Sequence, residues 1–189
     1  MEEEREPDVV QIGIALASHR IDATIFLPFL VTRLRSMTTT NEAMVTVLLH
    51  DIETPGEVRR DLKLRWNPDS EPRQPLGVGE KVITELAACG IANIVGNLYA
   101  GIVWRRVADE GDGFDYWVRQ NTVREVGLEV SGTMTEEEGV LEARHREKVA
   151  QLLGSQQRVG GFVAVVSFTL RRMIVSFHLA PGEIYEPLG

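Results

Sequence analysis

The sequence predicts a mixed α+β protein, in which an N-terminal β-rich segment precedes a core ordered helix–strand–strand–strand–helix–strand. Apolar residues alternate with charged ones along 58–66, which is the period of a half-buried strand. Beyond residue 80 they recur at helical spacing instead. The run 162–168 is almost continuously apolar, as expected of a strand that is covered on both faces. These patterns together predict a mixed sheet flanked by helices.

Residues 1–67 are predicted to form the β-rich subdomain, antiparallel from residue 9 onward. The runs 9–16 and 44–49 are apolar and partly β-branched, which favours strands. The apolar stretch 23–35 has a helix as its main alternative. The pattern leaves open whether this segment folds separately or extends the main sheet.

Residues 68–79 are predicted to be a linker between the two parts of the chain. The segment contains three prolines and two glycines. Each proline fixes φ and lacks a backbone donor, which disfavours regular structure. The predicted core therefore comprises residues 80–189.

The core begins with a predicted helix over 80–94, where Val82 and Leu86 lie on one apolar stripe that Ile83 widens. Thr135 and Glu138 match a capping box and predict the start of a second helix. The remaining core elements are expected at 99–107, 114–119, 124–131, 135–153, 162–168 and 173–179.

The composition indicates the cellular compartment and restricts the kinds of partner that the protein can bind. The net charge of -8 disfavours a broad, sequence-blind grip on nucleic acid, but it leaves room for nucleic acid in a local groove. Cys89 is the single cysteine, so no disulfide forms within one chain and a reducing compartment is expected. The N-terminus is acidic, unlike a secretory signal, and the apolar run 21–34 is too short and polar to span a bilayer. We expect a cytoplasmic protein with no membrane association.

Two carboxylates are predicted to meet on neighbouring strands. Side chains alternate along a strand, so Gly127, Glu129 and Ser131 share the face opposite the apolar residues between them. Asp115 lies on the corresponding face of the preceding strand, and the glycines are expected to leave open space around Glu129. Carboxylate oxygens with water and a phosphate oxygen suit Mg²⁺, which can activate water for phosphodiester cleavage.

The second predicted helix adds a cation to this site. Lys148 lies four residues before Leu152 and seven after Leu141, so it sits at the edge of the buried stripe. From there its ammonium can reach the strand carboxylates. Arg144 and Arg146 flank it on the same helix.

The order of elements, with Asp115 opening the second core strand and Glu129 in the third, resembles the PD-(D/E)XK (restriction-endonuclease-like) nuclease fold over about residues 78–179. The resemblance implies that Asp115 and Glu129 bind the metal. Members of this family often carry a glutamate on the first helix, for which Glu85 is a better choice than Glu80.

One position departs from the family pattern. The catalytic lysine of the family stands two residues after the strand glutamate, where this chain has Ser131. Some members supply the lysine from the following helix, which implies Lys148 as the substitute.

Two functions follow from the resemblance. The first is a Mg²⁺-dependent nuclease-like protein, in a setting such as bacterial defence or DNA processing. The alternative is a catalytically inactive nuclease-like fold that serves as a protein-binding or assembly module. In that case residues 1–67 would supply the surface for a protein partner or a second copy. A third arrangement is a subunit whose basic partner holds the nucleic acid.

Overall fold

The computed structural model describes residues 5–17, 21–50, 56–68, 77–120 and 124–183. Its elements are β1 (Asp8–Gln11), α1 (Ile12–Leu16), the 3-10 helix η1 (Ala23–Phe26), α2 (Leu27–Arg35), β2 (Glu42–His50), β3 (Glu57–Arg65), α3 (Glu80–Ala100), β4 (Ile102–Val107), β5 (Tyr116–Gln120), β6 (Val126–Thr133), α4 (Glu138–Leu153), β7 (Gly161–Ser167) and β8 (Arg172–His178).

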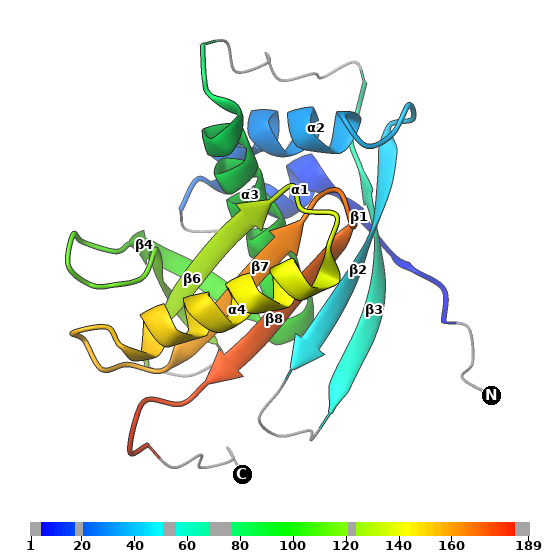
Figure 1. Cartoon of the computed structure of the whole chain (residues 1–189). Coiled ribbons are helices and arrows are strands. Elements are labelled where there is room, and N and C mark those ends of the chain that lie inside the picture. Colours follow the sequence, from blue (N-terminus) through cyan, green and yellow to red (C-terminus); the bar gives the residue numbers. More distant parts are fainter. Residues whose placement is uncertain (1–4, 18–20, 51–55, 69–76, 121–123, 184–189) are drawn as a thin grey trace.

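All eight strands belong to one mixed sheet with the order β1-β3-β2-β8-β7-β6-β5-β4 (Figure 1). The pairs β1–β3, β2–β8 and β6–β7 are parallel, and the other neighbours are antiparallel. The predicted order of the core, from α3 through β4, β5, β6 and α4 to β7, is confirmed together with the mixed fold class. The strands of the N-terminal segment extend this sheet through the β2–β8 pair. Residues 69–76 of the predicted linker lie outside the described residues, and the division into domains stays a prediction.

The N-terminal segment is less purely β than expected, and the predicted antiparallel arrangement is wrong for β1, which pairs with β3 in parallel. The helical alternative for 23–35 is the correct one, and the run 9–16 divides between β1 and α1. The side chain of Asp22 accepts a hydrogen bond from the Thr24 amide and so caps η1. Pro28 stands in the first turn of α2, where a missing amide proton costs nothing.

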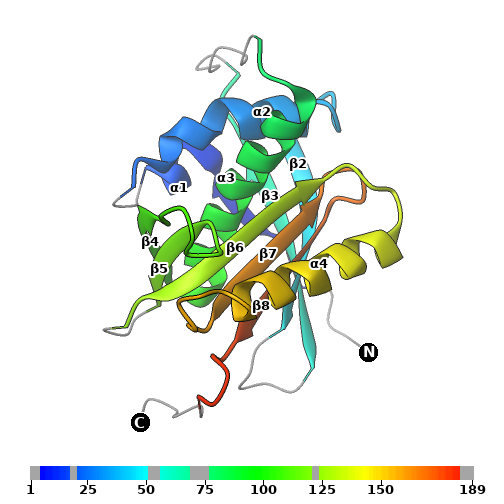
Figure 2. The same ribbon diagram turned by 60° about the vertical axis from the view of Figure 1, so that its left-hand side comes forward.

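Helices cover both faces of the sheet (Figure 2). The helices α1, η1, α2 and α3 lie on one face, and α4 lies across β6, β7 and β8 on the other. Along β7, Phe162 and Ala164 join the large core on the α3 side, while Val163 and Val165 join a smaller core beneath α4. This confirms that β7 is covered on both faces. The smaller core consists of Phe114, Trp117, Leu141, Leu152, Val163, Val165 and Ile174.

Helix α3 is the central helix of the large core. It continues six residues beyond its predicted end and stops at Gly101, which adopts the left-handed conformation that ends many helices. Cys89 is buried within it, and burial raises the pKa of this thiol to about 12. Of the described helices, α3 alone is long and apolar enough to cross a bilayer, with a mean hydropathy of 1.3, but 67% of that stretch is buried inside the fold. A buried core helix has the same composition.

Helix α4 begins at Glu138, and the predicted capping box is wrong. The hydroxyl of Thr135 accepts from the Glu137 amide, before the helix starts. The carbonyl of Thr135 in turn accepts a hydrogen bond from the Ser167 hydroxyl at 2.6 Å, which holds this residue against the sheet. Tertiary anchoring thus displaces the local cap.

We predict that Gly161→Ala destabilises the fold by about 3 kcal/mol, because a methyl group there would overlap the backbone of Gly127 on β6. Gly139→Ala is the matched control, since it adds the same group where nothing lies within 4 Å. We expect the control to stay within about 1 kcal/mol of the parent chain. Urea denaturation measures both, and equal free energies of unfolding would contradict the close β6–β7 approach.

Candidate functional site

The site forms where β6 loses its neighbour on one side. Strand β5 pairs with β6 only from Tyr116–Leu128 to Val118–Val126. One further ladder bond runs from the Asp115 amide to the Leu128 carbonyl at 3.1 Å. Beyond this point β6 has an open edge. Its backbone amides there need other acceptors, because an unpaired buried amide is costly.

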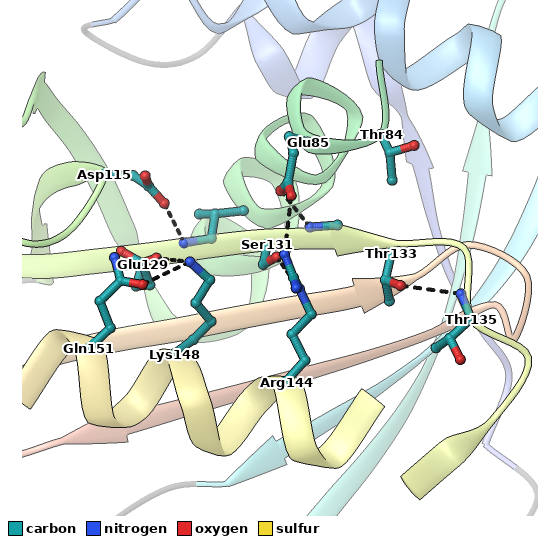
Figure 3. Close-up of polar contacts among 12 residues, drawn as sticks. Thr84, Glu85, Asp115, Glu129, Ser131, Thr133, Thr135, Arg144, Lys148 and Gln151 are labelled. Atoms are coloured by element: carbon teal, nitrogen blue, oxygen red, sulfur yellow. Dashed lines mark hydrogen bonds and ion pairs between the residues drawn. The ribbon is translucent and has the colours of Figure 1, made fainter. Parts of the chain in front are cut away.

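Two carboxylates supply those acceptors. Asp115 Oδ2 accepts from the Val130 amide and Glu85 Oε2 accepts from the Gly132 amide, both at 2.8 Å. Figure 3 shows the two carboxylates approaching β6 from β5 and from α3. At Gly132 a side chain would come within 2.5 Å of the Thr84 carbonyl oxygen. This glycine therefore allows α3 to lie directly against β6 and brings Glu85 to the edge.

Glu129 projects from β6 toward α4 and is 0% exposed. Its Oε1 accepts a 2.6 Å charged hydrogen bond from Lys148 Nζ. Its Oε2 is buried and has no partner among the described residues. Burial, followed by the charge of Asp115, raises the pKa of Glu129 to about 7, although Lys148 favours the ionised form.

The expected open space around Glu129 is absent, and that prediction is wrong. A side chain at Gly127 would lie 2.8 Å from Leu152 and 3.1 Å from Phe114, so the apolar stripe of α4 already fills the position. Gly132 is likewise packed against α3. These two glycines permit close packing, and Glu129 is enclosed as a result.

Helix α4 contributes a second cation to the site, one turn before Lys148. Arg144 Nε donates to the buried Ser131 hydroxyl at 2.8 Å, and its Nη2 lies 3.4 Å from Glu85 Oε1. Arg144 therefore reaches past the open edge of β6 and joins α4 to α3 (Figure 3). It contacts Ser131, which stands at the position of the catalytic lysine in the PD-(D/E)XK family.

The cluster has an excess of negative charge. Three carboxylates, on Glu85, Asp115 and Glu129, face two cations, on Arg144 and Lys148. Burial raises the pKa of Asp115, while the Val130 amide and the Lys148 charge partly offset this. Perturbed carboxyl groups of this kind gather at functional sites, although structural ion-pair networks produce them as well.

All four predicted site residues, Asp115, Glu129, Lys148 and Glu85, lie in this cluster. Within the described ranges, no three side chains of the His, Cys, Asp and Glu types are arranged to hold a metal ion. The bridging role of Arg144 was missed, although its position four residues before Lys148 on one helix face was a usable signal. The acceptor role of Asp115 and Glu85 toward β6 was also missed.

A cavity of about 330 Å³ lies apart from these charges. It is lined by residues of β1, α1 and α2 and by the segment after β3, namely Gln11, Gly13, Ile14, Leu27, Val31, Trp66 and Asn67. The charged cluster does not contribute to it.

No protein-family model matches the chain, and neither curated proteins nor solved structures show a significant match.

The raised pKa of Glu129 predicts a specific pH dependence of stability. Between its ordinary value of 4.5 and about 7, the folded state binds more protons at this residue than the unfolded state. The Glu129 contribution to the free energy of unfolding should therefore decrease as pH rises through this window, by up to about 1.4 kcal/mol per pH unit. We expect Glu129→Gln to remove this component, as measured by urea denaturation of both proteins across the window.

Glu147→Gln is the control, because Glu147 is an exposed carboxylate on the same helix. Its stability profile should follow that of the parent chain. Parallel profiles for Glu129→Gln and the parent would contradict the perturbed titration of Glu129.

Proposed function

We propose that the chain is a divalent-metal-dependent nuclease of the PD-(D/E)XK type, which hydrolyses phosphodiester bonds in a cytoplasmic setting. The observation that carries the proposal is the state of Glu129. This buried carboxylate has a lysine on one oxygen and, among the described residues, no partner on the other, and the charge of Asp115 affects its titration.

The donor set suits a hard cation such as Mg²⁺. Glu129 Oε2 is buried and has no partner in the described part of the chain, and the hydrogen bond from the Val130 amide to Asp115 uses Oδ2. Mg²⁺ commonly takes one or two protein carboxylates and completes its shell with water and substrate phosphate. Glu85 is the weaker candidate, because both of its oxygens already contact Gly132 or Arg144.

The bound ion would supply Lewis-acid activation of water and of the scissile phosphate. Lys148 would then transfer its hydrogen bond from Glu129 to a phosphate oxygen and neutralise charge there. Arg144, through Ser131 and Glu85, would keep α4 aligned along β6. Glu129 must be ionised to act, so activity should rise as pH increases through about 7.

A binding or assembly module on the same fold is the second candidate. It is favoured by Ser131, which stands where the resemblance places the catalytic lysine, and by the pairing of both cations with carboxylates. In this role the charged cluster would hold α3, β6 and α4 together. The net charge of -8 fits a protein partner or a second copy better than direct binding of nucleic acid.

Cleavage assays separate the two candidates. We expect the parent chain to cleave at least one of single-stranded DNA, double-stranded DNA and RNA when Mg²⁺ or Mn²⁺ is present. Glu129→Gln removes a charged metal ligand and should lower the rate by about 100-fold or more. Gel analysis of labelled substrates measures this.

The control variant Glu147→Gln should cleave like the parent chain. Absence of cleavage by the parent, or equal cleavage by Glu129→Gln, would reject the nuclease and leave the assembly module.

Lys148 is predicted to act on the phosphate and not on the metal. We expect Lys148→Met to lower cleavage by about 100-fold, because the charge that develops on the phosphate loses its cation. Binding of Mn²⁺ should persist, since Glu129 Oε1 is then released from the lysine. Calorimetry with Mn²⁺ tests binding, and wild-type cleavage by Lys148→Met would exclude the proposed role.

A further inference from the structure

Three histidines meet where α4 lies over the sheet, on the side of the helix away from the carboxylates. His145 on α4 lies between His50 at the end of β2 and His178 at the end of β8. Its ring centroid is 6.3 Å from that of each neighbour. We call these three residues, together with Ser176, the histidine seam.

Ser176 joins two of the rings through one buried oxygen. Its hydroxyl oxygen lies 2.7 Å from His145 Nε2 and 2.7 Å from His178 Nε2, and the residue is 3% exposed. A hydroxyl has one proton to donate. With both rings neutral, one ring nitrogen must donate to Oγ while the other accepts from it. The arrangement is therefore complete without any added proton.

Among the described residues, few groups compensate for positive charge on the histidine seam. The carboxylate of Glu57 on β3 lies 3.4 Å from His50 Nε2. On α4 the nearby charge is Arg146, itself 3.9 Å from Glu142. On the sheet side, β7 presents the apolar Val163 and Val165 to α4, and Arg172 of β8 is paired with Glu138.

Added protons are correspondingly unfavourable. Burial lowers the pKa of His145 to about 4, and the neighbouring His178, His50 and Arg146 act in the same direction. Burial, followed by His50, also lowers the pKa of His178. The two rings are thus kept neutral while α4 is docked.

The position of the seam connects this titration to the charged cluster. The same helix that buries His145 also carries Arg144 and Lys148, which hold Ser131, Glu85 and Glu129. We propose that the histidine seam is a pH-sensitive latch: protonation of His145 and His178 releases α4 from the sheet and withdraws Arg144 and Lys148 from the carboxylates. The latch acts on the docking of α4 whether the site is catalytic or an assembly surface.

Because folding lowers the pKa of His145, acidification should open the latch. For a base whose pKa is lowered on folding, the stabilisation is complete above the unfolded value of 6.5 and is lost as pH falls toward about 4. Glu129 titrates with the opposite sign over an overlapping range. The latch is therefore measured best in a Glu129→Gln background, where the opposing contribution is removed.

Native-state hydrogen exchange of the α4 amides tests the latch at about pH 7 and about pH 5. In Glu129→Gln we expect the protection factors of α4 to fall roughly tenfold or more on acidification, from the linkage of a single shifted histidine. Adding His145→Gln, which keeps an amide able to bond Ser176, should reduce the fall to the smaller contribution of His178. Adding Glu147→Gln should leave it unchanged.

Equal protection at both pH values, or a fall of the same size with and without His145→Gln, would overturn the latch. His178→Gln provides a second variant in case His145→Gln does not fold, and it should reduce the fall as well. An NMR titration of the parent chain is independent of any variant. A His145 ring that titrates below about pH 5 supports the proposal, and a midpoint near 6.5 rejects it.

Discussion

The buried ion pair between Lys148 and Glu129 is the interaction on which the rest of the site depends. It joins α4 to β6. The Glu129 side chain is 1% exposed and the Lys148 side chain is 16% exposed. The cost of removing two charges from water offsets much of their attraction, so a buried ion pair does not by itself indicate a large gain in stability. Here one carboxylate oxygen is left over, buried and without a partner in the described part of the chain. That remaining oxygen is what distinguishes a site from a simple link between two elements.

The open edge of β6 explains why these charges gather where they do. Strand β5 stops pairing at Leu128, and the carboxylates of Asp115 and Glu85 take over the amides of Val130 and Gly132. These two carboxylates thus complete the hydrogen bonding of β6 and lie close enough to Glu129 for their charges to raise its pKa. A nuclease would use this edge to admit a phosphate, whereas an assembly module would only need it closed.

Local patterns predicted which side chains share a face but not what covers that face. The alternation along β6 and the helical spacing of Lys148 both depend on neighbouring residues, and both are visible in the sequence. The amide contacts of Asp115 depend instead on where β5 ends, and the filling of Gly127 depends on the depth at which Leu152 packs. The histidine seam unites residues from three distant segments, so no spacing in the sequence could reveal it. The run 23–35 was ambiguous because a short apolar run can be a buried strand as well as a helix.

A crystal structure of the chain with Mn²⁺, examined for anomalous scattering, tests the central claim most directly. We predict one peak bound by Glu129 and Asp115, with the Lys148 ammonium turned away from Glu129. The contradicting result is a structure at high Mn²⁺ concentration with no peak between these carboxylates, in which Lys148 still holds Glu129.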